Sequence, residues 1–136
     1  MLEKWHKMNK IHIETSAGEL LDKITILEIK KEKISDQKSL ESINKEYSSL
    51  ESSVKKNIKI NDEIKDLWAQ LKDVNLKLWE IEDEIRLSEK NKKFDQKFIE
   101  LARSVYKYND NRAKIKSKIN QLSGSSIKEI KQYTEY

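Results

Sequence analysis

The chain has 136 residues, of which 38 % are charged and 36 % are hydrophobic, and its 28 basic and 24 acidic residues give a net charge of +4. With no proline and only two glycines, it lacks the turn residues that a many-stranded sandwich or barrel needs, which excludes an all-β fold. The absence of cysteine excludes disulfides and thiolate metal sites, and no apolar run approaches the roughly 20 residues that would span a membrane. We therefore expect a single cytoplasmic domain over residues 1–136.

The first part of the chain predicts a short extended segment followed by a helix. Residues 10–14 alternate apolar and polar side chains, which indicates an extended segment that lies along the helices. Ser16 and Glu19 have the spacing of a capping box, in which the serine oxygen accepts a hydrogen bond from an early helical N–H. The apolar stripe that follows predicts a helix over 16–34.

Apolar residues at steps of three and four predict three further helices, over 38–57, 61–89 and 94–122. A slip in the phase of the stripe predicts a turn at 57–61, but neither Gly nor Pro lies there, so one continuous helix is the alternative. A second capping-box signal predicts a C-terminal helical turn over 126–133.

The predicted fold is all-α, an antiparallel helical bundle of three to four helices. The third and fourth helices form a long hairpin, because the stripe of the third follows the strict four-and-three alternation of coiled-coil packing. This hairpin is longer than the other helices, so one end of the bundle is less covered. Trp68, Leu76 and Trp79 widen the stripe beyond what one partner helix covers, which favours a homo-oligomer.

The positive net charge does not indicate nucleic-acid binding. The basic residues are almost all lysines, and they alternate with acidic residues in the manner of a solvated helix surface rather than forming a basic stripe. A metal site is not predicted either, because His6 and His12 lack a third anchored ligand, and no pattern indicates a cofactor.

One charged residue interrupts the apolar seam of the predicted fourth helix. The steps from Val105 and Tyr108 lead to Arg112 before Ile115. A charge that points inward needs a partner, so Arg112 either forms an ion pair with an acidic residue of the first helix or binds an anion. Asp22 and Glu28 are the candidate partners.

Polar residues of the predicted fourth helix follow one another at steps of three and four, so they share one helix face next to the apolar seam. The first helix supplies complementary charges. The candidate ligand-binding residues are Asp22, Lys23, Glu28, Arg103, Tyr106, Asn109, Asp110, Arg112 and Lys116. No catalytic residue is assigned.

These features favour a non-enzymatic binding or scaffold module, with a polar site between the first and fourth helices for a small anion or an acidic segment of a protein partner. The alternative is a small helical enzyme that acts on a carboxylated or phosphorylated metabolite. A pocket with strongly perturbed carboxylates beside Arg112 would favour the enzyme, and a flat face of paired charges would favour the module.

Residues 18–30, which read GELLDKITILEIK, resemble the opening helix of an uncharacterised bacterial family of short helical proteins. Residues 101–120 carry a second block that resembles the family pattern LAR.VY..ND.RA.IK..IN. The resemblance implies a small helical bundle and gives no activity, since the family is a domain of unknown function.

The chain also resembles, in style, the small all-helical chorismate mutases, which hold a dicarboxylate between helices with Arg and Lys. That resemblance implies that Arg103, Arg112 and Lys116 would clamp the substrate and that Glu28 would hydrogen-bond to it. The sequence departs from this pattern because it lacks an arginine in the first helix.

Overall fold

The computed structural model describes residues 10–125 and 135–136, and most of this part of the chain is helical. The helices are α2 (Ala17–Lys33), α3 (Gln37–Asn57), α4 (Asp62–Lys90) and α5 (Gln96–Ser123). The described residues contain no strand, so the prediction of an all-α fold is confirmed. The predicted turn over 126–133 and the His6 candidate lie outside the described residues.

Each helix begins at a polar residue whose side chain accepts a hydrogen bond from the first turn. These N-cap residues are Ser16, Asp36, Asn61 and Asp95. The break between α3 and α4 therefore falls where the stripe changes phase, because Asn61 Oδ1 accepts from Ile64 N (2.9 Å) and starts a new helix. The chain bends at this point and does not continue as one long helix.

The start of α5 differs from the prediction. The apolar spacing predicts Phe94 as the first core position of this helix, but Phe94 lies in the connection before the cap and is 52 % exposed. Asp95 accepts a hydrogen bond from Phe98 N (3.2 Å), so the helix begins at Gln96. Apolar spacing alone does not distinguish a residue at the hairpin end from one inside the helix.

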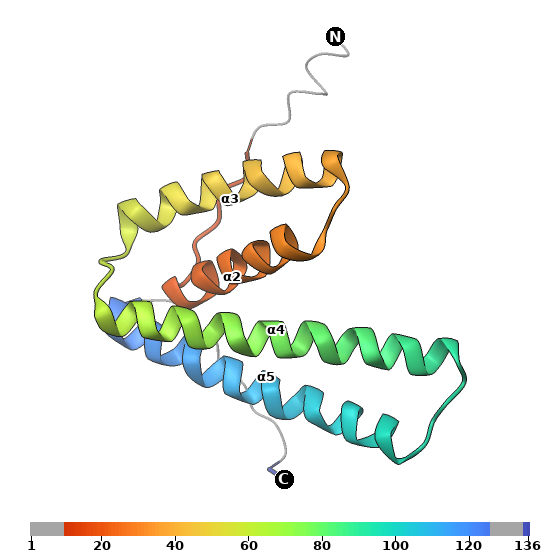
Figure 1. Ribbon diagram of the computed structural model, residues 1–136. Coiled ribbons are helices and arrows are strands. Elements are labelled where there is room, and N and C mark those ends of the chain that lie inside the picture. Colours follow the sequence, from red (N-terminus) through yellow and green to blue (C-terminus); the bar gives the residue numbers. More distant parts are fainter. Residues whose placement is uncertain (1–9, 126–134) are drawn as a thin grey trace.

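The helices are arranged as two hairpins, α2–α3 and α4–α5 (Figure 1). Among the described helices, α2 packs against the other three, whereas the backbone of α3 approaches only α2. The core follows from this arrangement, because α2 provides the deeply buried Leu21 and Ile24, and Leu71 of α4 and Ile119 of α5 pack in the same cluster. The position of α2 therefore determines how the hairpins fit together.

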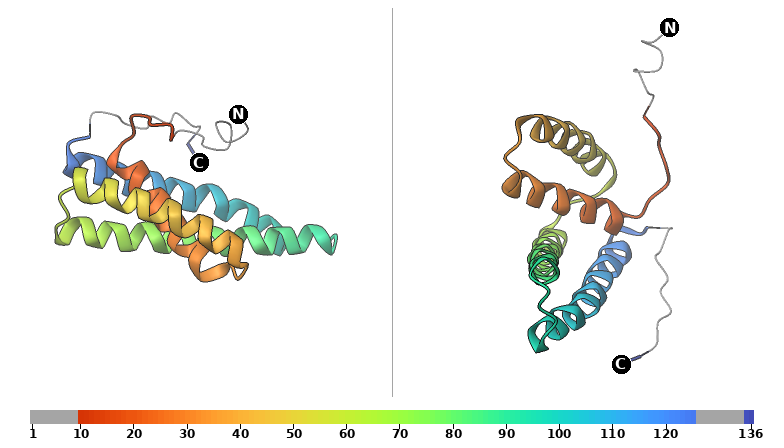
Figure 2. Two further views of the ribbon diagram at one scale, coloured as in Figure 1. Left: turned by 90° about the horizontal axis from the view of Figure 1, so that it is seen from above. Right: turned by 90° about the vertical axis from the view of Figure 1, so that its right-hand side faces the viewer.

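The α4–α5 hairpin extends beyond the hairpin formed by α2 and α3 (Figure 2). At about 1.5 Å per residue, the 29 residues of α4 span about 43 Å and the 17 residues of α2 about 25 Å. None of the four described helices is long and apolar enough to cross a membrane.

The N-terminal segment does not pack as predicted. Residues 10–16 form neither helix nor strand, and the side chains of Ile11 and Ile13 are 85 % and 78 % exposed. The expectation that this segment lies along the helices is therefore wrong. Its alternating pattern is too short to bury an apolar face.

Candidate functional site

A buried carboxylate joins three of the helices. Asp22 of α2 is 1 % exposed and accepts hydrogen bonds from the Nε (2.8 Å) and Nη2 atoms of Arg112 on α5. Asn75 of α4 donates its Nδ2 hydrogens to Asp22 Oδ1 (2.9 Å) and to Thr25 Oγ1 (2.8 Å). The two-bond arginine contact is the strongest geometry available to a carboxylate, so Asp22 holds α4 and α5 on the same side of α2.

The surroundings of Asp22 keep it ionised. Burial alone would raise its pKa, but hydrogen bonds from Arg112 and Asn75 and the positive charges of Arg112 and Lys116 outweigh burial. The pKa of Asp22 therefore lies below its ordinary value of 3.8. A carboxyl group in this state does not carry a proton at neutral pH and is poorly suited to act as a general acid or base.

The start of α2 is tied to the end of α5. Lys116 is buried and its Nζ lies 2.8 Å from Glu19 Oε2. The backbone N–H of Gly18 donates to Asn120 Oδ1 (2.7 Å), and that of Ala17 donates to Ser125 Oγ (3.0 Å). Because α5 and the Ser16 cap take up these N–H groups, the helix start does not offer them to an anion.

We call these interacting residues the polar cluster: Glu19, Asp22, Thr25, Asn75, Arg112 and Lys116. Three of the nine predicted site residues belong to it, namely Asp22, Arg112 and Lys116. Of the two partners considered for Arg112, the structure selects Asp22. Within the part of the chain that is described, no buried polar side-chain atom lacks a hydrogen-bond partner.

Glu28 belongs to a separate contact between α2 and α4. Its Oε1 atom accepts a hydrogen bond from Trp68 Nε1 (2.8 Å), and its Oε2 atom lies 3.6 Å from Lys72 Nζ. Lys72 also forms an ion pair with Glu32 (2.8 Å), and these interactions raise the pKa of Lys72. Glu28 thus supports the packing of α2 on α4 beside the polar cluster, because it follows Thr25 by three residues and Lys72 precedes Asn75 by three.

The remaining predicted residues lie outside the polar cluster or at its edge. Lys23 and Arg103 are exposed. Tyr106 packs edge to face on Tyr136, with ring centroids 5.0 Å apart, and the Tyr136 hydroxyl donates to Asp110 Oδ2 (2.7 Å). Asn109 Oδ1 accepts a long hydrogen bond from Arg112 Nη1 (3.4 Å) and so connects this outer surface to the cluster.

Sequence reasoning missed Asn75 and Thr25, which complete the hydrogen bonds of Asp22. Both lie among apolar residues of their helices, so neither interrupts the stripe as Arg112 does. The available signal was the small polar side chain of Asn75 directly after the seam residue Val74. A polar group beside a seam is often buried against a second helix.

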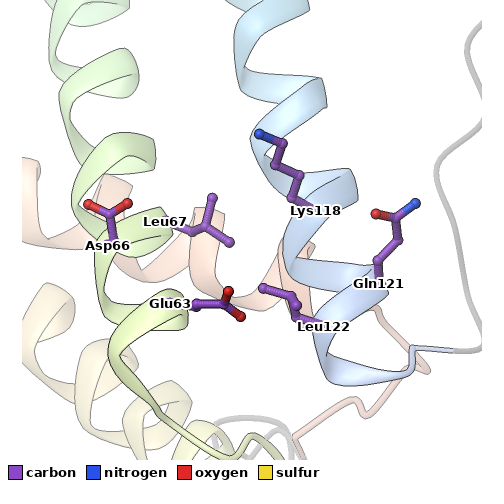
Figure 3. Close-up of a pocket in the computed structure, with 6 residues that line it drawn as sticks. All are labelled: Glu63, Asp66, Leu67, Lys118, Gln121 and Leu122. Carbon is purple, nitrogen blue, oxygen red and sulfur yellow. The ribbon is translucent and has the colours of Figure 1, made fainter.

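A shallow cleft of about 260 Å³ lies between the start of α4 and the end of α5 (Figure 3). It is lined by Glu63, Asp66, Leu67, Lys118, Gln121 and Leu122, and none of these was predicted as a site residue. Charges of both signs surround it, and it is open to solvent. In residues 10–125 and 135–136 no group of three acidic or histidine side chains is placed to hold a metal ion.

The lowered pKa of Asp22 predicts how the stability of the fold depends on pH. Because folding lowers its pKa, Asp22 contributes stability that is present above its ordinary value of 3.8 and is lost as pH falls through the lower folded-state pKa. Denaturant unfolding of wild type and Asp22→Asn should therefore differ most at neutral pH, and the difference should shrink in acid. Asp73→Asn, which removes an exposed carboxylate of α4, is the control. A difference that stays constant into strong acid would contradict the assignment.

A family model with the description "Family of unknown function (DUF6165)" matches residues 11–135. No match was found among curated proteins or among solved structures.

Proposed function

We propose that this chain, which belongs to the DUF6165 family of unknown function, is a single helical-bundle domain that acts as a non-enzymatic binding or scaffold module. The polar face between α2 and α5 continues onto the outer surface of α5, and this outer part binds an acidic segment of a protein partner. The observation that carries this proposal is that carboxylates of α2 pair with the half-buried Arg112 and the buried Lys116 of α5, so this inner part of the face serves the fold. Binding is left to the outer part of α5.

The neutralised cations argue against a catalytic pocket at this position. A site that clamps a dianionic substrate needs cations that its own carboxylates do not already hold. Arg112 is held by Asp22 and Lys116 by Glu19, and the ionised Asp22 lacks a proton to donate. The cleft in Figure 3 lies near the opposite end of the hairpin from Arg103 and does not include the predicted residues.

The outer surface of α5 has the properties of a docking face, which we define as Arg103, Tyr106, Asn109 and Asp110. Arg103 is exposed and offers the planar guanidinium that recognises carboxylates with two hydrogen bonds. Tyr106 is 40 % exposed and already packs against an aromatic residue from outside the hairpin, Tyr136. An exposed arginine beside an exposed tyrosine is a composition that protein interfaces favour.

The test is the binding of a fluorescently labelled oligoglutamate peptide, followed by anisotropy. We expect wild type to bind the peptide and Arg103→Glu to weaken binding by about tenfold or more, because a close charge pair at an interface is worth more than about 1 kcal/mol. Lys114→Glu is the matched control, since it makes the same change in charge at another exposed position of α5. Equal binding by the two variants would overturn the assignment of the face.

Phosphate and citrate are included in the same experiment because they also carry negative charge, but in a compact form. If these anions displace the peptide, and do so equally from wild type and Lys114→Glu, the result would favour a small-anion site on this face. Thermal stabilisation by either anion, lost in Arg103→Glu, would give the same answer. Neither effect is expected if the face recognises an extended acidic segment.

A further inference from the structure

The end of the α4–α5 hairpin that extends beyond α2 carries a group of exposed apolar side chains. Leu87 of α4, Phe94 of the connection and Ile99 of α5 are 57 %, 52 % and 47 % exposed. Single exposed apolar residues are ordinary, but several at one end of a hairpin are typical of an interaction surface. This is the end at which α4 and α5 pack without α2 or α3 (Figure 1).

The two helices carry opposite charges at this end. The far part of α4 has a run of exposed acidic residues, which are Glu80, Glu82, Asp83 and Glu84. The matching part of α5 has the exposed basic residues Lys97, Arg103 and Lys107. An acidic segment and a basic docking face therefore occur within one chain.

These charges are paired weakly or not at all within the hairpin. Among the described residues, Glu80 and Glu82 form only long, exposed ion pairs within α4, with Lys77 (3.9 Å) and Arg86 (3.7 Å). In the same part of the chain, none of the three α5 cations takes part in an ion pair. Exposed ion pairs of this kind contribute little to stability, so the charges of both surfaces are available to interact with a partner.

The spacing of the residues allows one copy to dock on another in register. Glu84 and Leu87 share a face of α4, and Ile99 and Arg103 share a face of α5, because each pair is three or four residues apart. Leu87 and Ile99 each lie six residues from Lys93, while Glu84 lies nine residues and Arg103 ten residues from it. An antiparallel contact between α4 of one copy and α5 of another thus places leucine on isoleucine and glutamate beside arginine.

We infer that the acidic segment recognised by the docking face is the Glu80–Glu84 run of a second copy of this chain. The inference rests on the proposed function, because it names the partner of the same face. Leu87 and Ile99 supply apolar contact at the closed end of the hairpin, and the charges fix the register of the two copies. The chain then assembles through its own hairpin ends.

Light scattering coupled to size exclusion, over a dilution series, measures the mass directly. Wild type should have at least twice the protomer mass of 16.2 kDa. Arg103→Glu alone, or Glu80→Lys with Glu84→Lys, should each weaken self-association by about tenfold or more, because like charges then meet. Mixing the two variants should restore the larger species, since each reversed surface now finds its complement.

The controls separate this inference from the proposed function. Lys114→Glu should leave the mass unchanged, and circular dichroism checks that every variant keeps its helices. A wild-type protein that stays at the protomer mass, or a mixture that fails to restore assembly, would overturn the inference. If the oligoglutamate peptide still binds wild type through Arg103 in that case, the proposed function stands and the partner is a different protein.

Discussion

Replacing Arg112 by leucine should lower the free energy of unfolding by about 3 kcal/mol, the lower end of the range for removing one partner of a buried ion pair, because the arginine side chain is 28 % exposed. Asp22 is 1 % exposed and takes two hydrogen bonds from Arg112, so the substitution leaves a buried carboxylate without its main counter-charge. Leucine fits the apolar seam, but it cannot neutralise the carboxylate of Asp22. Urea unfolding followed by circular dichroism measures the loss directly.

The control is Lys114→Leu, which also replaces a cation by leucine at an exposed position of the same helix. Its effect should stay within about 0.5 kcal/mol, as for ordinary surface changes. A double-mutant cycle with Asp22→Asn sharpens the result, because once the carboxylate is neutral the Arg112→Leu change should cost clearly less. An Arg112→Leu protein that is as stable as wild type would instead mean that this arginine is retained for binding.

The extents of the helices could be predicted from the sequence because they depend on local signals. The three-and-four spacing of apolar residues sets each helix, and caps such as Asn61 and Asp95 fix where it starts. The arrangement of the helices could not be predicted in the same way. That α2 lies at the centre and α3 at the edge depends on how the stripes of different helices match one another, which the spacing within a single helix does not determine.

The candidate site could be predicted in part, for a related reason. Arg112 could be identified because a charge on an apolar seam is a local anomaly, and its pairing with an acid of α2 follows from the cost of burying it alone. Lys31 lies on the apolar stripe of α2 between Leu27 and Ile34, but it is exposed and needs no buried partner. Its ammonium lies 4.2 Å above the ring of Tyr47 on α3. Asn75 was missed because nothing in its own helix indicates that Asp22 needs it.

A second large effect is expected at Gly18, where the backbone of α2 lies close against α5. A Cβ atom at this position would lie 2.6 Å from the backbone oxygen of Lys116 and 2.8 Å from Asn120 Oδ1. We therefore expect Gly18→Ala to lower the free energy of unfolding by about 1–3 kcal/mol, the range for overpacking, even though alanine favours a helix by about 1 kcal/mol. If α2 and α5 move apart to accept the methyl group, the hydrogen bond from Gly18 N to Asn120 Oδ1 also lengthens.

Two further variants distinguish this clash from other glycine effects. Gly124 has a φ of 64°, and a Cβ atom added there would meet nothing within 4 Å, so Gly124→Ala reports backbone strain alone, at roughly 1–2 kcal/mol. Shortening Asn120 to alanine should not rescue Gly18→Ala, because the nearest atom belongs to the backbone of Lys116 and cannot rotate away. Full rescue by Asn120→Ala would show that only the amide side chain opposes the methyl group, and that the two backbones have room to accept it.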